Sequence, residues 1–439
     1  MTGDSMTNID EYRLNLAKQA YGLWGIKPEL VSEAETVEAE LSESFARIEA
    51  NKAYNQLKVL HAMQDAKYAE TDFVASTGYG YNDSGREKLE QIYAKAFGAE
   101  SALVRLSISS GTQAIATALY ACLRPGDELL AAFSKPYDTL DSILGFGEAA
   151  NKDLGSLRDL GVTYQQAELT AKGLPNIPEI LSKINEKTKV VHLQRSRGYQ
   201  RRKAFTINEL NEVIAAVKSK KPEVIVFVDN CYGEFTETME PTQVGADLIA
   251  GSLIKNPGGG LAPCGGYVAG RADLVEKAHA HLTAPGLGGE VGPSLGFNRN
   301  LVQGFYFAPH VVAECLKGME FAALWFSKHG VVSQPKAKGI RSDIVQLLEF
   351  AKPEELVKFC QAIQAASPID SHFKPIPWAM PGYDSEVIMA CGAFVQGSSL
   401  ELSADGPIKA PYTAYMQGGL VYENVKLAVL LATNDLLNS

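Results

Sequence analysis

A lysine and an aspartate each follow a strand-like segment, and together they could do the chemistry of an aldehyde cofactor. Lys255 follows the run 250–254, and Asp229 follows the β-branched run 224–228. Ligands of open α/β sheets bind at the carboxyl ends of the strands, so we expect both side chains in one crevice. A lysine amine can form a Schiff base with pyridoxal 5'-phosphate (PLP), and a buried carboxylate can keep the pyridine nitrogen protonated. The pair therefore predicts a PLP site.

Each member of the pair also has an ordinary structural interpretation. An acid at the end of a strand can cap the helix that follows, and a lysine in a loop can simply be solvated. Three glycines, 258–260, come shortly after Lys255. They favour the functional interpretation, because glycine lets the backbone approach another group closely.

A phosphate-binding site is predicted at a short turn before an apolar helical stretch. Free backbone N–H groups and the helix dipole attract a phosphate there, and hydroxyl side chains add donors. An ordinary helix N-cap is the alternative if the turn is considered alone. Ser252, three residues before Lys255, could supply a further hydroxyl to the same phosphate. The turn consists of Ser110, Gly111 and Thr112.

Tyr137 is the candidate for an aromatic contact with the cofactor. It follows the strand-like segment 128–132, so its ring could lie flat against a planar cofactor at the same edge of the sheet. The alternative is a tyrosine that only packs in the core or on the surface.

The elements that must position these residues alternate along the chain. Strand-like and helical segments follow one another between about residues 87 and 290, which predicts a mostly parallel sheet with helices on both faces. We expect strands at 102–106, 128–132, 190–194, 224–228 and 248–252, and helices at 87–97, 112–122, 138–146 and 207–218.

Three parts are predicted along the chain. Residues 1–75 form an N-terminal helical arm, 76–330 a large PLP-binding domain, and 331–439 a smaller C-terminal α+β domain. The last part contains a strand-like segment at 386–395 and a closing helix near 422–436.

The composition favours small-molecule chemistry over partners that need a basic surface. The 439 residues include 41 Lys and Arg against 51 Asp and Glu, so we expect neither a nucleic-acid nor a membrane partner. Six scattered cysteines without a CxxC pair, and apolar stretches too short to span a bilayer, predict reduced thiols in the cytoplasm. His279 and His281 would face different sides of a helix, so we expect no metal site.

Together these residues resemble the Cys/Met-metabolism family of PLP enzymes, which has the aspartate-aminotransferase-like fold (PLP fold type I). The resemblance covers nearly the whole chain, and it is closer to the bacterial branch of aluminium-resistance or cystathionine β-lyase-like proteins. The family motifs are Val228-Asp229-Asn230, Ser252-x-x-Lys255, Ser110-Gly111-Thr112 and Tyr137-Asp138-Thr139, and the branch segments are 77–81, 135–140, 194–199 and 396–407.

The resemblance implies a fold, an assembly and a set of roles. The fold is a mostly parallel seven-stranded sheet with a smaller C-terminal α+β domain, and the assembly is a dimer of dimers with active sites shared between subunits. Lys255 and Tyr137 would be catalytic. The cofactor would be held by Ser110, Gly111, Thr112, Tyr137, Asp229, Ser252 and Lys255, with Tyr79 and Tyr81 from the loop that a neighbouring subunit lends.

Three departures, two from the wider family and one from the branch, concern charge. Where the family has a Tyr-x-Arg pair for the phosphate, this chain has Tyr79-Gly80-Tyr81, with Arg86 further on. Arg195 or Arg197 could bind the phenolic oxygen of the cofactor or the carboxylate of the substrate. Lys409 stands where the branch tends to have arginine, and a lysine cannot make the planar two-pronged bond to a carboxylate.

The expected activity is a PLP-dependent carbon–sulfur lyase that acts on a sulfur-containing amino acid of the cystathionine, methionine or cysteine type. Elimination would proceed at the β or γ carbon. The alternatives are another PLP reaction, namely replacement, racemisation or transamination, or a non-catalytic PLP-binding protein with a regulatory or tolerance role. A dehydrogenase is disfavoured, because the chain lacks the glycine fingerprint of dinucleotide-binding proteins.

Overall fold

The computed structural model describes residues 4–145, 155–379 and 385–437. It divides into two compact units. Unit 1 comprises Met1–Ala50, Val311–Ile340 and Ile344–Ser439, and unit 2 comprises Asn51–His310 and Arg341–Asp343. Helices α3 (Ser42–Asp65) and α10 (Asn298–Lys328) contribute residues to both. The units thus group residues 1–50 with the C-terminal part, whereas the sequence interpretation extends the arm to residue 75.

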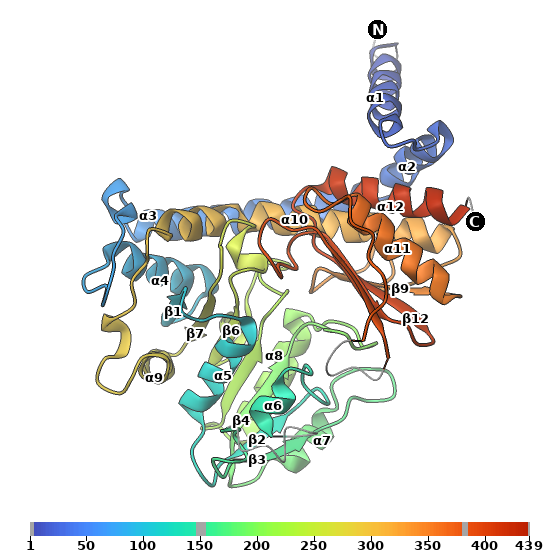
Figure 1. Cartoon of the computed structure of the whole chain (residues 1–439). Helices are drawn as coiled ribbons and strands as arrows, with labels where there is room; N and C mark the ends of the chain where they lie inside the picture. Colours follow the sequence, from blue (N-terminus) through green and yellow to red (C-terminus); the bar gives the residue numbers. More distant parts are fainter. Residues whose placement is uncertain (1–3, 146–154, 380–384, 438–439) are drawn as a thin grey trace. The chain divides into compact units, whose positions relative to one another are not determined.

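A seven-stranded sheet forms the centre of unit 2 (Figure 1). Only β7 runs antiparallel to its two neighbours, and all other adjacent strands are parallel. The predicted mostly parallel seven-stranded sheet is confirmed. The strands are β1 (Ser101–Arg105), β2 (Glu128–Ala131), β3 (Thr163–Gln166), β4 (Thr188–Gln194), β5 (Ile225–Asp229), β6 (Leu248–Ser252) and β7 (Gly266–Gly270), in the order β1-β7-β6-β5-β4-β2-β3.

Helices α4, α5, α7 and α8 of unit 2 begin at residues whose side chains cap them. Asp83 accepts a hydrogen bond from the backbone of Arg86 at the start of α4, and Thr206 forms a capping box with Glu209 at the start of α8. Residue 146, at the end of the predicted helix 138–146, lies outside the described residues. The helices are α4 (Ser84–Phe97), α5 (Gly111–Cys122), α6 (Leu140–Leu144), α7 (Ile177–Lys183), α8 (Ile207–Lys220) and α9 (Ala272–Leu282), with short 3-10 helices at Glu70–Phe73, Pro241–Val244, Asn256–Gly258 and Gly288–Glu290.

Helix α5 is packed against the sheet through one apolar cluster. Ile115 and Ala118 of α5 are buried together with Phe227 of β5, Leu248 of β6 and Val268 of β7. Burial of such side chains contributes roughly 1.5–3 kcal/mol each, so the cluster fixes the start of α5 relative to the ends of the strands.

Unit 1 contains a five-stranded antiparallel sheet in the order β10-β11-β12-β9-β8 (Figure 1). The predicted smaller α+β domain is confirmed. Its core joins Trp325 of α10, Phe359 of α11 and Val425 of α12 with Val37 of the N-terminal helix α2. The elements are β8 (Val332–Gln334), β9 (Val345–Phe350), β10 (Val387–Cys391), β11 (Ser403–Pro407), β12 (Tyr412–Gln417), α1 (Asp4–Gly22), α2 (Pro28–Glu40), α11 (Pro353–Ala365) and α12 (Tyr422–Leu437).

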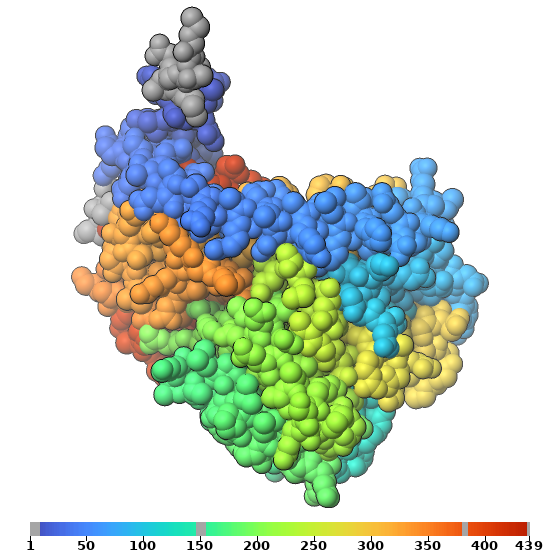
Figure 2. Space-filling model, turned by 180° about the vertical axis from the view of Figure 1, so that it is seen from behind, coloured from blue at the N-terminus to red at the C-terminus, as the bar shows by residue number. Residues whose placement is uncertain are grey.

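Helix α1 lies at the surface of unit 1, in dark blue in Figure 2. Ile9, Tyr12 and Leu16 recur at helical spacing and are exposed. In the described part of the chain, no helix combines the length and the apolar character that crossing a bilayer requires.

Candidate active site

The ends of three neighbouring strands define the candidate site. Gln194 at the end of β4 pairs with Asp229 at the end of β5, and Asp229 pairs with Ala250 of β6. Lys255 comes three residues after Ser252, the last residue of β6. The parallel arrangement therefore brings Lys255 and Asp229 to the same edge of the sheet, as the sequence predicts.

Lys255 is partly buried, and its nitrogen faces an aromatic ring. The Nζ atom lies 4.1 Å from the ring centroid of Tyr232. Burial by itself lowers the pKa of Lys255, but the acidic groups of Cys231, Tyr232, Asp229 and Tyr137 outweigh it and leave the pKa above its usual range. The lysine is thus held as an ammonium ion when nothing is bonded to it.

Asp229 is buried, with 5% of its surface exposed. Its Oδ1 atom accepts a hydrogen bond of 3.1 Å from the backbone N–H of Cys231. Burial raises the pKa of the carboxyl, and the positive charge of Lys255 opposes this. No ion pair joins Lys255 and Asp229 in the described residues. The two groups thus affect each other electrostatically without forming an ion pair.

The predicted phosphate turn packs directly against this edge. Ser110 caps α5 by accepting a hydrogen bond of 3.1 Å from the backbone of Gln113. A Cβ atom on Gly111 would lie 3.2 Å from Cβ of Ser252 and 3.5 Å from Sγ of Cys231. The turn and β6 therefore approach each other closely, so that a side chain at position 111 would be tight, which places the start of α5 beside Ser252.

Thr112 is connected to the segment that carries Tyr137. Its hydroxyl lies 2.9 Å from the hydroxyl of Thr139. The backbone N–H of Tyr137 donates a hydrogen bond of 2.7 Å to Oε1 of Gln194, and its ring lies 5.8 Å from the ring of Tyr199. The electrostatic influence of Tyr137 on Lys255 shows that the two are near each other. Strand β4, α5 and the Tyr137 segment thus converge on the lysine.

Tyr79 and Tyr81 form an exposed aromatic pair on a loop of unit 2. Their rings stack at 5.4 Å, and 68% and 54% of their surfaces are exposed. Arg86 is buried, and its Nη1 atom donates to the backbone oxygens of Gly80 at 2.8 Å and Gly292 at 2.7 Å. Arg86 therefore holds the loop in place. Neither tyrosine makes a hydrogen bond or ring contact with Lys255 within the described ranges.

The two candidate arginines lie in different surroundings. Both terminal nitrogens of Arg195 are occupied, with Nη1 at 2.9 Å from Oδ1 of Asn230 and Nη2 at 2.9 Å from Oε1 of Glu237. Glu240 lies 3.5 Å from Nη1. This partner set makes Arg195 a structural anchor. Arg197 is buried, and its backbone N–H donates to Asp343 at 3.1 Å.

Lys409, the third residue assigned to the substrate, belongs to unit 1. It follows β11 and is exposed. Lys255 belongs to unit 2, so the role of Lys409 stays a prediction.

Sequence reasoning missed Tyr232, Gln194 and Asn256. The side-chain amide of Asn256 donates to the backbone oxygens of Tyr232 at 3.0 Å and Glu234 at 2.9 Å, which fastens the loop after Asp229 to the residue after Lys255. The available signal was position, because each of these residues lies within three positions of a strand end or of Lys255.

The comparison with protein families decides the identity of the fold and the family. Residues 30–437 match the model of the methionine gamma-lyase family. The chain belongs to this family. Bacillus subtilis protein YnbB, which is uncharacterised, is 50% identical over 401 residues that cover 91% of this chain and 95% of YnbB.

Two solved structures are also similar over almost the whole chain. A carbon–sulfur lyase involved in aluminium resistance from Clostridium novyi NT is 44% identical, with a TM-score of 0.91, and the match covers 95% of this chain and 98% of that one. A candidate cystathionine β-lyase involved in aluminium resistance from Listeria monocytogenes is 49% identical, with a TM-score of 0.90, and covers 92% and 98%. The predicted resemblance to this branch is confirmed.

A more distant structure supports the fold class alone. The pyridoxal-5'-phosphate-dependent protein YhfS from Escherichia coli is 16% identical, with a TM-score of 0.60, and the match covers 89% of this chain and 97% of YhfS. This member of the methionine gamma-lyase family therefore has PLP fold type I, as predicted.

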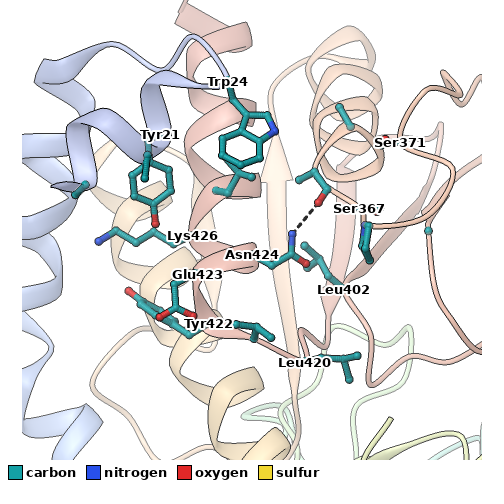
Figure 3. Close-up of a pocket in the computed structure, with 18 of the residues that line it drawn as sticks. Tyr21, Trp24, Ser367, Ser371, Leu402, Leu420, Tyr422, Glu423, Asn424 and Lys426 are labelled. Atoms are coloured by element: carbon teal, nitrogen blue, oxygen red, sulfur yellow. Dashed lines mark hydrogen bonds between the residues drawn. The ribbon is translucent and has the colours of Figure 1, made fainter. Parts of the chain in front are cut away.

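A separate cavity of about 1150 Å³ lies in unit 1 of this family member. Figure 3 shows the side chains of Tyr21 and Lys426 next to each other in its wall. Lys426 pairs with Glu35 at 2.6 Å and with Glu38 at 2.5 Å. None of the predicted site residues lines this cavity.

His279 and His281 lie on α9, as the sequence indicates. The ring of His281 stacks on Tyr120 at 5.2 Å, and burial lowers the pKa of His279 to about 3. Over the described ranges, no group of three His, Cys, Asp or Glu residues could hold a metal ion.

Proposed function

We propose that this chain is a PLP-dependent carbon–sulfur lyase that acts on a sulfur-containing amino acid of the cystathionine, methionine or cysteine type. Membership of the methionine gamma-lyase family and the likeness to the carbon–sulfur lyase of Clostridium novyi support the reaction class. The observation that carries the proposal is the arrangement of Lys255 and Asp229 at one sheet edge, held apart, with the α5 turn packed beside them.

The residues present fit the cofactor. Lys255 would hold its aldehyde carbon and Asp229 its ring nitrogen, because a positive nitrogen offsets the burial of the carboxylate. Tyr137 would stack on the ring. The phosphate would lie at the positive end of α5 and accept hydrogen bonds from the N–H groups and hydroxyls of the turn. The phosphate residues are Ser110, Gly111, Thr112 and Ser252.

The bound cofactor would supply an electron sink for negative charge at Cα of the substrate. The chain's own residues would handle the protons. Lys255 would take the proton from Cα and return it at the neighbouring carbon, and Tyr137 would assist proton transfer to the departing sulfur. In β-elimination the Cα–H and Cβ–S bonds break, and in γ-elimination a Cβ–H bond breaks as well before the Cγ–S bond. In both cases one water is consumed, and a thiol (hydrogen sulfide from cysteine), a keto acid and ammonia are released.

Substrate binding and assembly complete the proposal. Arg197, the buried arginine whose backbone contacts Asp343, would bind the substrate carboxylate. Lys409 keeps its sequence-based assignment as a substrate-binding residue. Tyr79 and Tyr81 would contact the cofactor phosphate of a neighbouring subunit in a dimer of dimers, because their rings are exposed on a loop that Arg86 fixes. We place the protein in the cytoplasm, without nucleic-acid or membrane partners.

Product analysis tests the reaction class. The purified protein with PLP is incubated separately with cystathionine, methionine and cysteine, and keto acid, ammonia and thiol are quantified. We expect equal amounts of the three products from at least one substrate. Lys255→Ala should give none, and Lys409→Arg should keep the product ratio while changing KM. Racemised or transaminated amino acid without thiol would contradict the lyase assignment.

A further inference from the structure

Tyr232 has a backbone conformation that a tyrosine rarely adopts. Its φ angle is +70°, in the left-handed region where side chains other than glycine are disfavoured. Such strain persists only where the surroundings enforce it, and it concentrates at functional sites. The strained residue comes three positions after Asp229, inside the candidate site.

Hydrogen bonds on both sides enforce this conformation. Asn256, the residue after Lys255, donates its side-chain amide to the backbone oxygen of Tyr232. The backbone N–H of Gly233 donates to the oxygen of Asn230 at 2.9 Å, which closes a tight turn around Tyr232. Asn256 therefore fixes the backbone of Tyr232. Because Asn256 directly follows Lys255, this one hydrogen bond positions the tyrosine ring relative to the lysine.

The strained conformation presents the face of the ring to the lysine nitrogen. Lys255 Nζ lies 4.1 Å from the ring centroid, well within the distance at which an ammonium ion is attracted to an aromatic face. This attraction requires the positive charge and acts on a neutral amine only weakly. Cys231, Asp229 and Tyr137 also act electrostatically on Lys255, and no ion pair joins it to Asp229 among the described residues. The ring of Tyr232 is the neighbour that lies directly against this nitrogen.

We propose that Tyr232 is a positioning residue that seats the ammonium of Lys255 whenever its nitrogen is not bonded to the cofactor. The occasions for this, before cofactor loading and after Lys255 has taken the proton from Cα of a bound substrate, rest on the proposed function. The contact between the Tyr232 ring and the ammonium of Lys255 is itself a property of the cofactor-free chain. It holds the nitrogen of Lys255 against the ring face and favours its protonated form, which is the form that can deliver a proton.

The test measures the reactivity of Lys255 in the full-length protein without cofactor. Wild type, Tyr232→Phe and Tyr232→Leu are labelled with trace acetic anhydride between pH 7 and 11, and the peptide that contains Lys255 is quantified by mass spectrometry. Only the neutral amine reacts, so loss of the ring face in Tyr232→Leu should raise labelling at pH 8 by about 2- to 30-fold. Tyr232→Phe keeps the face and should stay within about twofold of wild type.

Matched variants keep the result interpretable. Tyr306→Leu changes a tyrosine of α10 that is not among the groups acting electrostatically on Lys255, and it should leave Lys255 labelling unchanged. Asn256→Ser removes the amide clamp but keeps the ring, so it should move labelling in the same direction by a smaller factor, and it replaces Tyr232→Leu if that variant does not fold. Equal labelling in all variants, or a change in Tyr232→Phe as large as in Tyr232→Leu, would overturn the proposal.

The outcome is separable from that of the proposed function. Each protein is then mixed with PLP and its visible absorption is recorded. A missing absorption band in wild type, with the labelling difference present, would remove the proposed function and leave the role of Tyr232 in place. A normal absorption band without the labelling difference would overturn the role of Tyr232 and leave the proposed function in place.

Discussion

Two groups of buried charges share the loop that follows β5, and they are built differently. In the Arg195 group, comprising Arg195, Asn230, Glu237 and Glu240, cation and anions are bonded to each other directly. In the Lys255 group, comprising Lys255, Asp229 and Tyr232, Asp229 is buried, Lys255 is partly buried, and no ion pair joins the two charges in the described residues.

The Arg195 group uses charge to hold the fold together, whereas the Lys255 group is arranged for chemistry. Buried charges that only support a fold are stable when they are paired and hydrogen-bonded, as in the Arg195 group, where both terminal nitrogens of the guanidinium have partners. Charges that must bind and react are kept apart, with pKa values shifted by burial and by neighbours. The chain alternates between the two uses within a few residues, since Asp229 and Tyr232 face the lysine whereas Asn230 and Gly233 contact Arg195.

The largest expected effect on stability comes from breaking the Arg195 group. Arg195→Met leaves the fully buried carboxylate of Glu240 without its cation, which should lower the free energy of unfolding by about 3–5 kcal/mol. Urea denaturation measures the loss. The double variant Arg195→Met/Glu240→Gln removes the stranded charge and should recover at least half of it. A loss below about 1 kcal/mol in the single variant would show that the pair does not anchor the loop.

An intermediate effect is expected at Glu234, which lies near both groups. Burial raises the pKa of Glu234 to about 8, although Tyr267 donates a hydrogen bond of 2.7 Å to it. A carboxyl with a raised pKa stabilises the fold fully below its ordinary value of about 4.5, and this contribution is lost as the pH rises through about 8. Glu234→Gln cannot ionise, so it avoids the loss.

The measurement is the free energy of unfolding between pH 5 and 9. Relative to wild type, Glu234→Gln should gain about 2–4 kcal/mol over this range, with the gain growing as the pH rises. Tyr267→Phe, which removes the hydroxyl donor, serves as a control for the hydrogen bond alone. Parallel pH profiles of Glu234→Gln and wild type would mean that Glu234 is ionised in the fold.

The smallest expected effect on stability comes from Asp229→Asn. Burial raises the pKa of Asp229 and makes its charge unfavourable in the cofactor-free protein. The neutral amide should therefore leave the free energy of unfolding unchanged or raise it by about 1 kcal/mol, while turnover of the PLP-loaded protein falls. A loss of stability as large as that of Arg195→Met would erase the distinction between the two groups.

The sequence predicts the sheet edge that carries Asp229 and Lys255, because local sequence patterns are enough to locate the strands that end there. The β-branched run before Asp229 and the apolar run before Lys255 indicate parallel strands, and parallel strands bring their ends together. The Ser-Gly-Thr turn is also recognisable from a local pattern, because serine is a preferred N-cap residue and an apolar helical stretch follows it. Strand β3 escapes prediction because its sequence is Thr-Tyr-Gln-Gln, without apolar alternation, and β7 because glycine begins and ends it.

The roles of individual side chains depend on contacts that no spacing reveals. Arg195 and Arg197 differ by two positions, yet Arg195 meets Glu240, which lies far along the chain. Arg86 follows the tyrosine loop as a phosphate-binding arginine could, but it holds backbone oxygens of Gly80 and Gly292. Tyr232 acquires its role through a left-handed conformation, and tyrosine is among the residues for which sequence patterns do not indicate one.

The most direct measurement of the central claim is chemical trapping of the cofactor on its lysine. The PLP-loaded protein is reduced with borohydride, digested, and mapped by mass spectrometry, with Lys255→Ala treated in the same way. We predict one pyridoxyl group per chain, attached to Lys255, and none in the variant. Attachment to another lysine, or the absence of any attached group in wild type, would contradict the account.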